Sequence, residues 1–214
     1  MLCQTVWLLS GSDHRIHVYH SDKVSYQEED RDSPSFPEFS SLTQITLWMD
    51  ILYSPDKKRR VSAVGGEGGK VEVFGVTLDP LPHVTSSQSV SWDYPISSVN
   101  IFNLKTTLPV PMFLKGTNSY SPQVVLVYKL REEDEEEDQE ESSSPWRVQH
   151  TMKLPCPVLS IIYCDVTGDG CFELVIMTTA GIHIFQHDPR DMAALVLRRL
   201  RALTEHEKLS ALGT

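Results

Sequence analysis

One short pattern occurs three times in the sequence, and no other feature constrains the fold as strongly. Each copy is an apolar strand, a turn that contains glycine, and an alternating strand that ends in an aromatic residue; the copies lie at residues 6–19, 61–74 and 174–185. Glycine suits these turns because it adopts positive φ without steric cost. The period-two alternation places one face of each strand in a core. The pattern therefore predicts three β-hairpins.

The spacing of the copies predicts a fourth. Their second strands begin at Ile16, Val71 and Ile182, so the first interval is 55 residues and the next is 111. A missing copy is expected near position 126, where Val124–Tyr128 is an apolar run that ends in an aromatic. Units of this size are typical of β-propeller blades, which recur at roughly 40–50 residues and bury a face only against their neighbours. We expect an all-β, propeller-like fold, incomplete, with about four blade units. An ordinary β-sandwich with coincidental spacing is the alternative.

The segments between the copies differ in composition from the copies themselves. Residues 27–41 and 77–89 are polar and contain proline, so we expect connectors there. Residues 132–141 hold nine acids, which accounts for nearly all of the net charge of −10. Because like charges repel and cannot be buried, we expect a disordered acidic insert at 131–145 that protrudes from a blade hairpin. The rest of the chain is almost neutral and lacks the basic face that nucleic acid requires.

The domain boundary is expected after residue 187, with a partial propeller at 1–187 and a helix and tail at 188–214. Asp188 suits an N-cap and Pro189 the first helical position. The helix is amphipathic, because Met192, Leu195, Val196, Leu200 and Leu203 share one face. That face either docks on the propeller or binds a partner, for which Arg198, Arg199 and Leu200 are the candidate contacts.

The loop 165–173 is the sharpest candidate for chemistry. Oxygen donors at alternate positions, with glycine at the sixth, allow a short loop to wrap a hard cation such as calcium. It resembles the loops of FG-GAP and integrin-type propellers, and Leu174–Met177 supplies the strand expected to follow. The alternative is a metal-free turn whose aspartates accept backbone N–H groups. The candidate ligands are Asp165, Thr167, Asp169, the carbonyl of Cys171, and Glu173.

The remaining motifs favour binding over catalysis. The basic cluster of Lys57, Lys58, Arg59 and Arg60 is either a solvated turn or a contact for an acidic partner. The segment Gly65–Lys70 misses the spacing of a phosphate-binding loop and is followed by a strand, so we interpret it as a hairpin turn. No arrangement of nucleophile, base and orienting group is visible. We expect a protein that is not an enzyme and needs no cofactor, calcium aside.

Cellular location follows from two weaker signals. The four cysteines form no C-x-x-C pair, which favours reduced thiols in the cytosol. No stretch of about 18 apolar residues exists, so we expect a soluble chain without direct membrane insertion.

Five blocks of sequence together resemble the kaptin family. They follow one another in the same order as in that family and cover much of the chain. The blocks are TVWLLSGSDHRIHVYH (5–20), LWMD (47–50), RRVSAVGGEGGKVEV (59–73), DVTGDGCFELVIMTTAGIHIFQH (165–187) and LVLRRLR (195–201).

The resemblance implies a function that composition alone does not. Kaptin-like proteins are subunits of KICSTOR, a scaffold that holds the GATOR complex on the lysosome and restrains the mTOR kinase complex when amino acids or glucose are scarce. They are also described as actin-associated, at lamellipodia and stereocilia. The implied location is cytoplasmic, at the lysosomal surface through partners or in actin-rich projections. Kaptin-like chains are longer, so we interpret this one as a shortened or partial form. Its unpaired edge strands would then need a partner to cover them.

Overall fold

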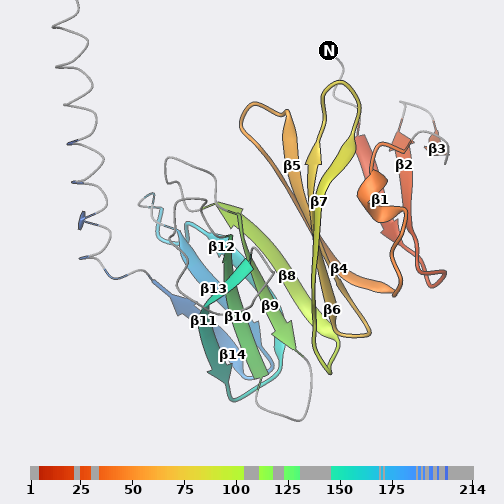
Figure 1. Ribbon diagram of the computed structural model, residues 1–214. Coiled ribbons are helices and arrows are strands. Elements are labelled where there is room, and N and C mark those ends of the chain that lie inside the picture. Colours follow the sequence, from red (N-terminus) through yellow and green to blue (C-terminus); the bar gives the residue numbers. More distant parts are fainter. Residues whose placement is uncertain are drawn as a thin grey trace, which may run out of the picture.

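The computed structural model describes residues 5–186, apart from gaps at 22–24, 30–33, 104–110, 118–122, 131–145, 169 and 171. Beyond 186 it describes only residues 188, 190, 193, 194, 197 and 201. Within these residues the chain forms fourteen β-strands and one short 3₁₀ turn. The strands make four antiparallel sheets, and in each sheet neighbours in the chain are also neighbours in space (Figure 1). The all-β, propeller-like architecture expected from the repeat is confirmed, with four blade-like units.

The sheets are named A to D in chain order. Sheet A contains β1 (Thr5–Ser10), β2 (Ile16–Ser21) and β3 (Tyr26–Glu28). Sheet B contains β4 (Thr46–Tyr53), β5 (Arg59–Gly66), β6 (Lys70–Thr77) and β7 (His83–Ser91). Sheet C contains β8 (Ile96–Asn103), β9 (Pro111–Thr117), β10 (Gln123–Leu130) and β11 (Trp146–Leu154). Sheet D contains β12 (Val158–Cys164), β13 (Glu173–Thr178) and β14 (Gly181–Phe185), and the 3₁₀ turn η1 is Pro37–Phe39.

The sequence repeat corresponds to one structural unit. The three predicted hairpins are β1–β2, β5–β6 and β13–β14, and all three are antiparallel pairs. The predicted fourth copy, Val124–Tyr128, lies in β10, which is the third strand of sheet C just as β6 is of sheet B. The repeat therefore covers the second and third strands of each four-stranded unit. By the same correspondence sheet A has no described counterpart of the first strand, and sheet D none of the fourth.

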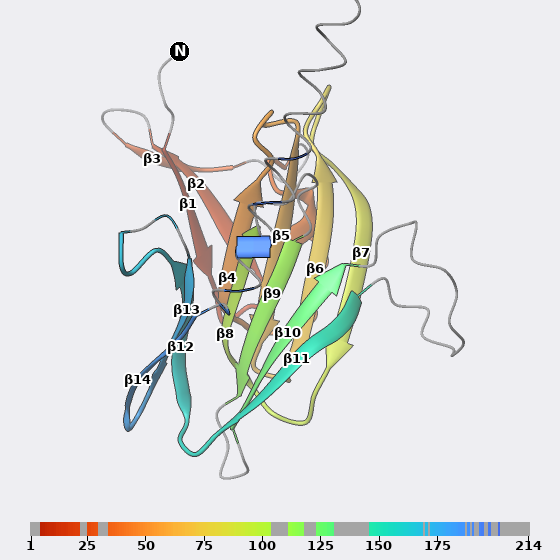
Figure 2. The ribbon, with the colours of Figure 1, turned by 90° about the vertical axis from the view of Figure 1, so that its left-hand side faces the viewer.

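The first strands of sheets B, C and D, which are β4, β8 and β12, lie next to one another (Figure 2). Strand β8 packs against β4 on one side and against β12 on the other. Each of the three carries a register shift at the same place relative to its hairpin partner, between Thr46 and Trp48, Ile96 and Ser98, and Val158 and Ser160. A bulge increases local twist, so the shared bulge bends all three first strands in the same way.

Three apolar clusters fill the spaces between adjacent sheets. Sheets A and B, with η1, enclose Ile16, Phe36, Phe39, Val64, Phe74 and Val76. Sheets B and C enclose Ala63, Val71, Val73, Ile96, Val99, Ile101, Leu126 and Tyr128. Sheets C and D enclose Phe102, Val125, Val127, Leu154, Val158, Ile161 and Ile176. Each inner sheet is thus apolar on both faces, because each face meets a neighbour.

The expected connectors are corrected in two places. Residues 77–89 were predicted to be a connector, but β7 begins at His83, and only residues 78–82 join it to β6. Strand β7 is the outermost strand of sheet B and is largely exposed, so it lacks the alternating apolar residues that reveal a strand in sequence. The segment 27–41 likewise includes the end of β3 and η1.

Two predicted segments fall mostly outside the described residues. The acidic insert 131–145 is one, and the strands that flank it, β10 and β11, pair with each other, so it does join the two strands of a hairpin. The C-terminal helix of 188–214 is the other. Isolated described positions between 190 and 201 have helical backbone, but no helix is established there, and the helix is not supported. The domain boundary stays a prediction.

Candidate functional site

The loop between β12 and β13 is closed by its own carboxylates. Asp165 accepts hydrogen bonds from the backbone N–H groups of Gly168, at 2.7 Å, and Gly170, at 2.9 Å. Glu173 is buried and accepts the N–H of Val166 at 2.8 Å. Both glycines have positive φ, 73° and 83°. These contacts are those of the metal-free turn, and they engage two of the candidate ligands.

The calcium interpretation of this loop stays a prediction. Thr167 is described and exposed, but Asp169 and Cys171 lie outside the described residues. Among the described residues, no cluster of three or more His, Cys, Asp or Glu side chains is arranged to hold a metal ion. Calorimetric titration with calcium discriminates the two interpretations, because only a loop that binds the cation should give a heat of binding at millimolar calcium.

The basic cluster forms the hairpin turn between β4 and β5. Asp56 accepts hydrogen bonds from the hydroxyl of Ser54 at 2.5 Å and from the N–H of Lys58 at 3.0 Å. The bond from Ser54, followed by that from Lys58, lowers the pKa of the Asp56 carboxyl. Lys57 takes positive φ at 56° and is exposed, as are Lys58 and Arg59. The turn therefore presents three cations on a backbone ordered by its own side chains.

Arg60 does not belong to that exposed surface, and its predicted role as a partner contact is corrected. It is almost fully buried and forms a two-point ion pair with Glu38 of η1, through Nε to Oε1 at 2.8 Å and Nη2 to Oε2 at 2.7 Å. The guanidinium also donates to the carbonyl of Ser35 at 2.7 Å and stacks on Phe36 at 4.1 Å. Ser62 donates a further bond to Glu38 at 2.7 Å. These contacts fasten η1 to sheet B.

Hydrogen bonds join sheet A to sheet B, sheet B to sheet C, and sheet C to sheet D. None of them was anticipated from the sequence. The hydroxyl of Ser10 in sheet A donates to the carbonyl of Thr46 in sheet B at 2.6 Å. Asp50 of β4 accepts the backbone N–H of Ile101 in β8 at 2.6 Å. The backbone N–H of Ile161 in β12 donates to the hydroxyl of Ser98 in β8 at 3.2 Å. These residues are ordinary in sequence, and only their position on strands of adjoining sheets makes them links.

Burial raises the pKa of the Asp50 carboxyl, and hydrogen bonds from the N–H groups of Ile101 and Ile51 only partly counteract this. A buried carboxylate is costly unless it is hydrogen-bonded, and the bond from Ile101 of β8 links sheet C to Asp50 of sheet B. Hydrogen bonds between adjacent sheets thus add to the apolar packing that holds the four sheets together.

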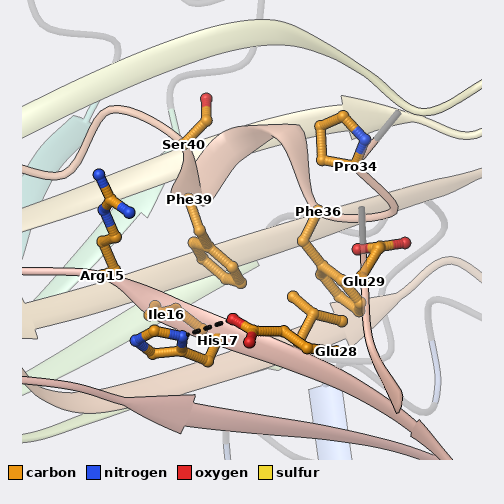
Figure 3. Close-up of a pocket in the computed structure, with 10 residues that line it drawn as sticks. Arg15, Ile16, His17, Glu28, Glu29, Pro34, Phe36, Phe39 and Ser40 are labelled. Carbon is orange, nitrogen blue, oxygen red and sulfur yellow. Dashed lines mark hydrogen bonds and ion pairs between the residues drawn. The ribbon is translucent and has the colours of Figure 1, made fainter. Parts of the chain in front are cut away.

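A pocket of about 250 Å³ lies between β2, the end of β3 and the η1 segment (Figure 3). Its lining includes the apolar residues Ile16, Phe36 and Phe39 and the acids Glu28 and Glu29. Glu29 accepts from both the N–H and the hydroxyl of Ser35. Each carboxylate lies within hydrogen-bonding distance of a histidine ring, Glu28 of His17 at 2.8 Å and Glu29 of His20 at 3.2 Å.

His17 lies between two carboxylates. Its Nδ1 is 2.8 Å from Glu28 Oε1, and its Nε2 is 3.2 Å from Asp13 Oδ2. The hydrogen bond with Glu28, followed by that with Asp13, raises the pKa of His17 above its ordinary value of 6.5. A raised folded-state pKa contributes stability below the unfolded pKa, and this contribution is lost as pH rises through the folded pKa. The attachment of β3 to β2 should therefore weaken as the solution becomes alkaline.

We expect Glu28→Gln to lower the pKa of His17, because the amide cannot stabilise the imidazolium as a carboxylate does. The measurement is an NMR titration of the His17 ring protons. Glu67→Gln, which changes an exposed acid in the β5–β6 turn, is the matched control and should leave the His17 midpoint in place. Equal midpoints in the wild type and Glu28→Gln would contradict the assignment.

The predicted partner contacts Arg198, Arg199 and Leu200 lie outside the described residues. Of the helices in the part of the chain that is described, none is long and apolar enough to cross a membrane. Among the described residues, the exposed basic turn of Lys57, Lys58 and Arg59 is the predicted partner contact that the structure places.

Comparisons with known proteins give a matching family model, a relative and a similar solved structure. The model of the family "KICSTOR complex protein kaptin" matches residues 2–123 and 116–197. The KICSTOR complex protein kaptin of Mus musculus is 26% identical over 262 residues, which cover 96% of this chain and 59% of that protein. A crystal structure of BBS1N in complex with ARL6DN, soaked with mercury, has a TM-score of 0.44 and 10% identity, over 88% of this chain and 64% of that one. The chain thus spans less than two thirds of the mouse relative. Because the family model matches most of its length, the chain belongs to the kaptin family.

Proposed function

We propose that this chain is a non-catalytic scaffold subunit of a KICSTOR-type complex. In this role it holds the GATOR complex at the lysosomal surface and so restrains mTOR complex signalling when amino acids or glucose are scarce. Membership of the kaptin family is the observation that carries the proposal. The fixed stack of four sheets supports it, because a scaffold needs surfaces whose relative positions do not change.

The exposed basic turn is the surface we assign to an acidic partner within that assembly. Lys57, Lys58 and Arg59 project from the β4–β5 hairpin, and the bonds of Ser54 and Asp56 order the backbone before a partner arrives. Preordering reduces the entropy lost on binding. Clustered surface charges chiefly raise the rate of association and select the partner.

Affinity purification from cells starved of amino acids tests the proposal. We expect the tagged chain to recover the other KICSTOR subunits together with the GATOR complex. Reversal of the turn, Lys57→Glu with Lys58→Glu and Arg59→Glu, should reduce that recovery severalfold. The control is Lys153→Glu, at an exposed cation on β11. Absence of every KICSTOR subunit from the wild-type purification would refute the scaffold role.

The basic turn also favours a second candidate, binding to actin filaments at lamellipodia and stereocilia. A cationic, ordered turn is suited to a polymer with an acidic surface. Co-sedimentation with filamentous actin tests it, and the charge-reversed turn should remain in the supernatant. Binding to filaments without recovery of KICSTOR subunits would favour this cytoskeletal function.

A further inference from the structure

Ser54 directly follows strand β4 and begins the basic turn. Pro55 comes next, and Lys57 is three residues after the serine. Kinases of the proline-directed class phosphorylate a serine that is followed by proline, and their cyclin-dependent members prefer a Lys or Arg three residues after the serine. A short motif of this kind is a hypothesis that only its structural context can support.

Turn geometry by itself accounts for part of this pattern. Serine, proline and aspartate are favoured in tight turns, and the N–H of Lys57 donates to the carbonyl of Ser54 at 2.9 Å. Turn geometry does not require the cations that follow at positions 57–59. All three of these are exposed, so the residue that such a kinase selects after the proline is accessible on the surface.

The structure separates Ser54 from a second serine that a kinase motif marks nearby. Ser62 follows residues 59–61, RRV, which is the pattern that basophilic kinases select. Its exposed fraction is 0%, and its hydroxyl donates to the buried carboxylate of Glu38 at 2.7 Å. A kinase could reach that hydroxyl only if sheet B unfolded. Ser54 is half-buried, and the turn residues after it are exposed.

A kinase binds its substrate in an extended conformation, so the turn has to open around the serine. No side chain of residues 54–59 belongs to any of the three apolar clusters. Hydrogen bonds hold the turn closed, among them those from the N–H of Ser54 to the carbonyl of Arg59 at 2.9 Å and from the N–H of Leu78 to the carbonyl of Lys58 at 2.8 Å. Segments that bury little apolar surface open locally more readily than the core does. The turn can therefore present Ser54 while the sheets stay folded.

We propose that Ser54 is phosphorylated by a proline-directed kinase, and that the phosphate stops the basic turn from binding an acidic partner. In the reaction the hydroxyl oxygen of Ser54 bonds to the γ-phosphorus of ATP. The bond from that phosphorus to the bridging oxygen breaks, ADP leaves, and the hydroxyl proton passes to the aspartate base of the kinase. The effect on binding rests on the proposed function of the turn, whereas the modification itself does not.

The phosphate changes both the order and the charge of the turn. The esterified oxygen has no proton, so its bond to Asp56 at 2.5 Å is lost, and the carboxylate and the phosphate repel each other. A phosphate monoester carries a charge of about −1.5 to −2 at neutral pH and accepts strong hydrogen bonds from Lys and Arg. It therefore cancels most of the positive charge of Lys57, Lys58 and Arg59. The attraction that steers an acidic partner to the turn is then lost.

Reaction of the purified chain with a cyclin-dependent kinase and ATP tests the modification, and tandem mass spectrometry locates the phosphate. Ser144 is also followed by proline and, three residues on, by Arg147, so the assay uses Ser144→Ala as its background. We expect phosphate on Ser54 in that background, and none there in Pro55→Ala. A chain that takes up no phosphate at Ser54 would overturn the proposal.

Two neighbouring cations provide a matched pair of variants for the same assay. Lys57→Ala should slow the incorporation of phosphate severalfold, because it removes the cation at the position that the kinase selects. Lys58→Ala removes an equally exposed cation one residue later and should react at nearly the wild-type rate. Equal rates for Lys57→Ala and Lys58→Ala would show that the turn is not recognised through this motif.

Ser54→Asp and Ser54→Asn test the effect on binding, because both remove the hydroxyl and only the first adds a charge. In affinity purification from cells starved of amino acids, Ser54→Asp should recover severalfold less of the KICSTOR subunits than Ser54→Asn. Equal recovery by the two variants would refute the effect on binding. A wild type that recovers no KICSTOR subunit would refute the scaffold function and this effect together, while phosphate found on Ser54 in the kinase assay would still establish the modification site.

Discussion

Replacing Arg60 with methionine should lower the free energy of unfolding by about 3–5 kcal/mol. The guanidinium is almost fully buried and forms two bonds with Glu38, which is itself buried. Removal of one partner leaves the other charge in a place that water does not reach, and this desolvation dominates the loss. The carbonyl of Ser35 and the ring of Phe36 lose a contact at the same time. Equilibrium denaturation in urea measures the difference.

Arg59→Met is the matched control, because Arg59 is the preceding residue on the same strand but is exposed. Surface changes of this kind are usually within about 0.5 kcal/mol. A double variant, Arg60→Met with Glu38→Leu, should recover part of the loss, since no charge is then left buried. A single Arg60→Met variant as stable as Arg59→Met would show that the pair does not hold η1 to sheet B.

The second large effect is expected at Gly69, in the turn between β5 and β6. Gly69 has φ of 83°, and a Cβ there would lie 2.1 Å from the backbone oxygen of Trp92 and 2.6 Å from that of Tyr94. An alanine costs strain in the left-handed region and also forces backbone atoms apart. We expect Gly69→Ala to destabilise the chain by about 2–4 kcal/mol, measured by urea denaturation.

Gly68→Ala is the control for this turn. Its Cβ would meet only Oε1 of Gln44, at 3.0 Å, and the end of a flexible side chain can move aside. The variant should therefore lose much less stability than Gly69→Ala. Similar losses for the two alanines would mean that the glycines of this turn are required for a reason other than the approach of Trp92 and Tyr94.

The repeated hairpins were predictable because their determinants are local. Glycine in the turn and alternation in the strand act over fewer than ten residues, and they located β1–β2, β5–β6 and β13–β14. The interval between copies then located β10. Strand β7 was missed for the opposite reason: its side chains are mostly exposed, so its place in sheet B depends on pairing with β6 and not on its own pattern.

The candidate partner contacts likewise divide into features visible in the sequence and features that only the fold decides. The basic turn was visible in the sequence as four consecutive cations, but the sequence could not separate Arg60 from the other three. Arg60 is buried because η1, more than twenty residues earlier, supplies Glu38 as its partner. The acids of the loop after β12 suggested metal ligands, and this stays a prediction; the bonds from Gly168 and Gly170 to Asp165 are a detail that only the folded turn supplies.

The sequence by itself determined the all-β class, the repeated hairpins and the resemblance to the kaptin family, because these depend on local pattern and on the order of sequence blocks along the chain. Only the tertiary structure decided which faces are buried between sheets and which are left open. Val71 and Ile182 are both β-branched, apolar residues that follow a turn, and nothing in the local sequence distinguishes them. Their burial differs because sheet C packs on Val71, whereas no described sheet covers Ile182.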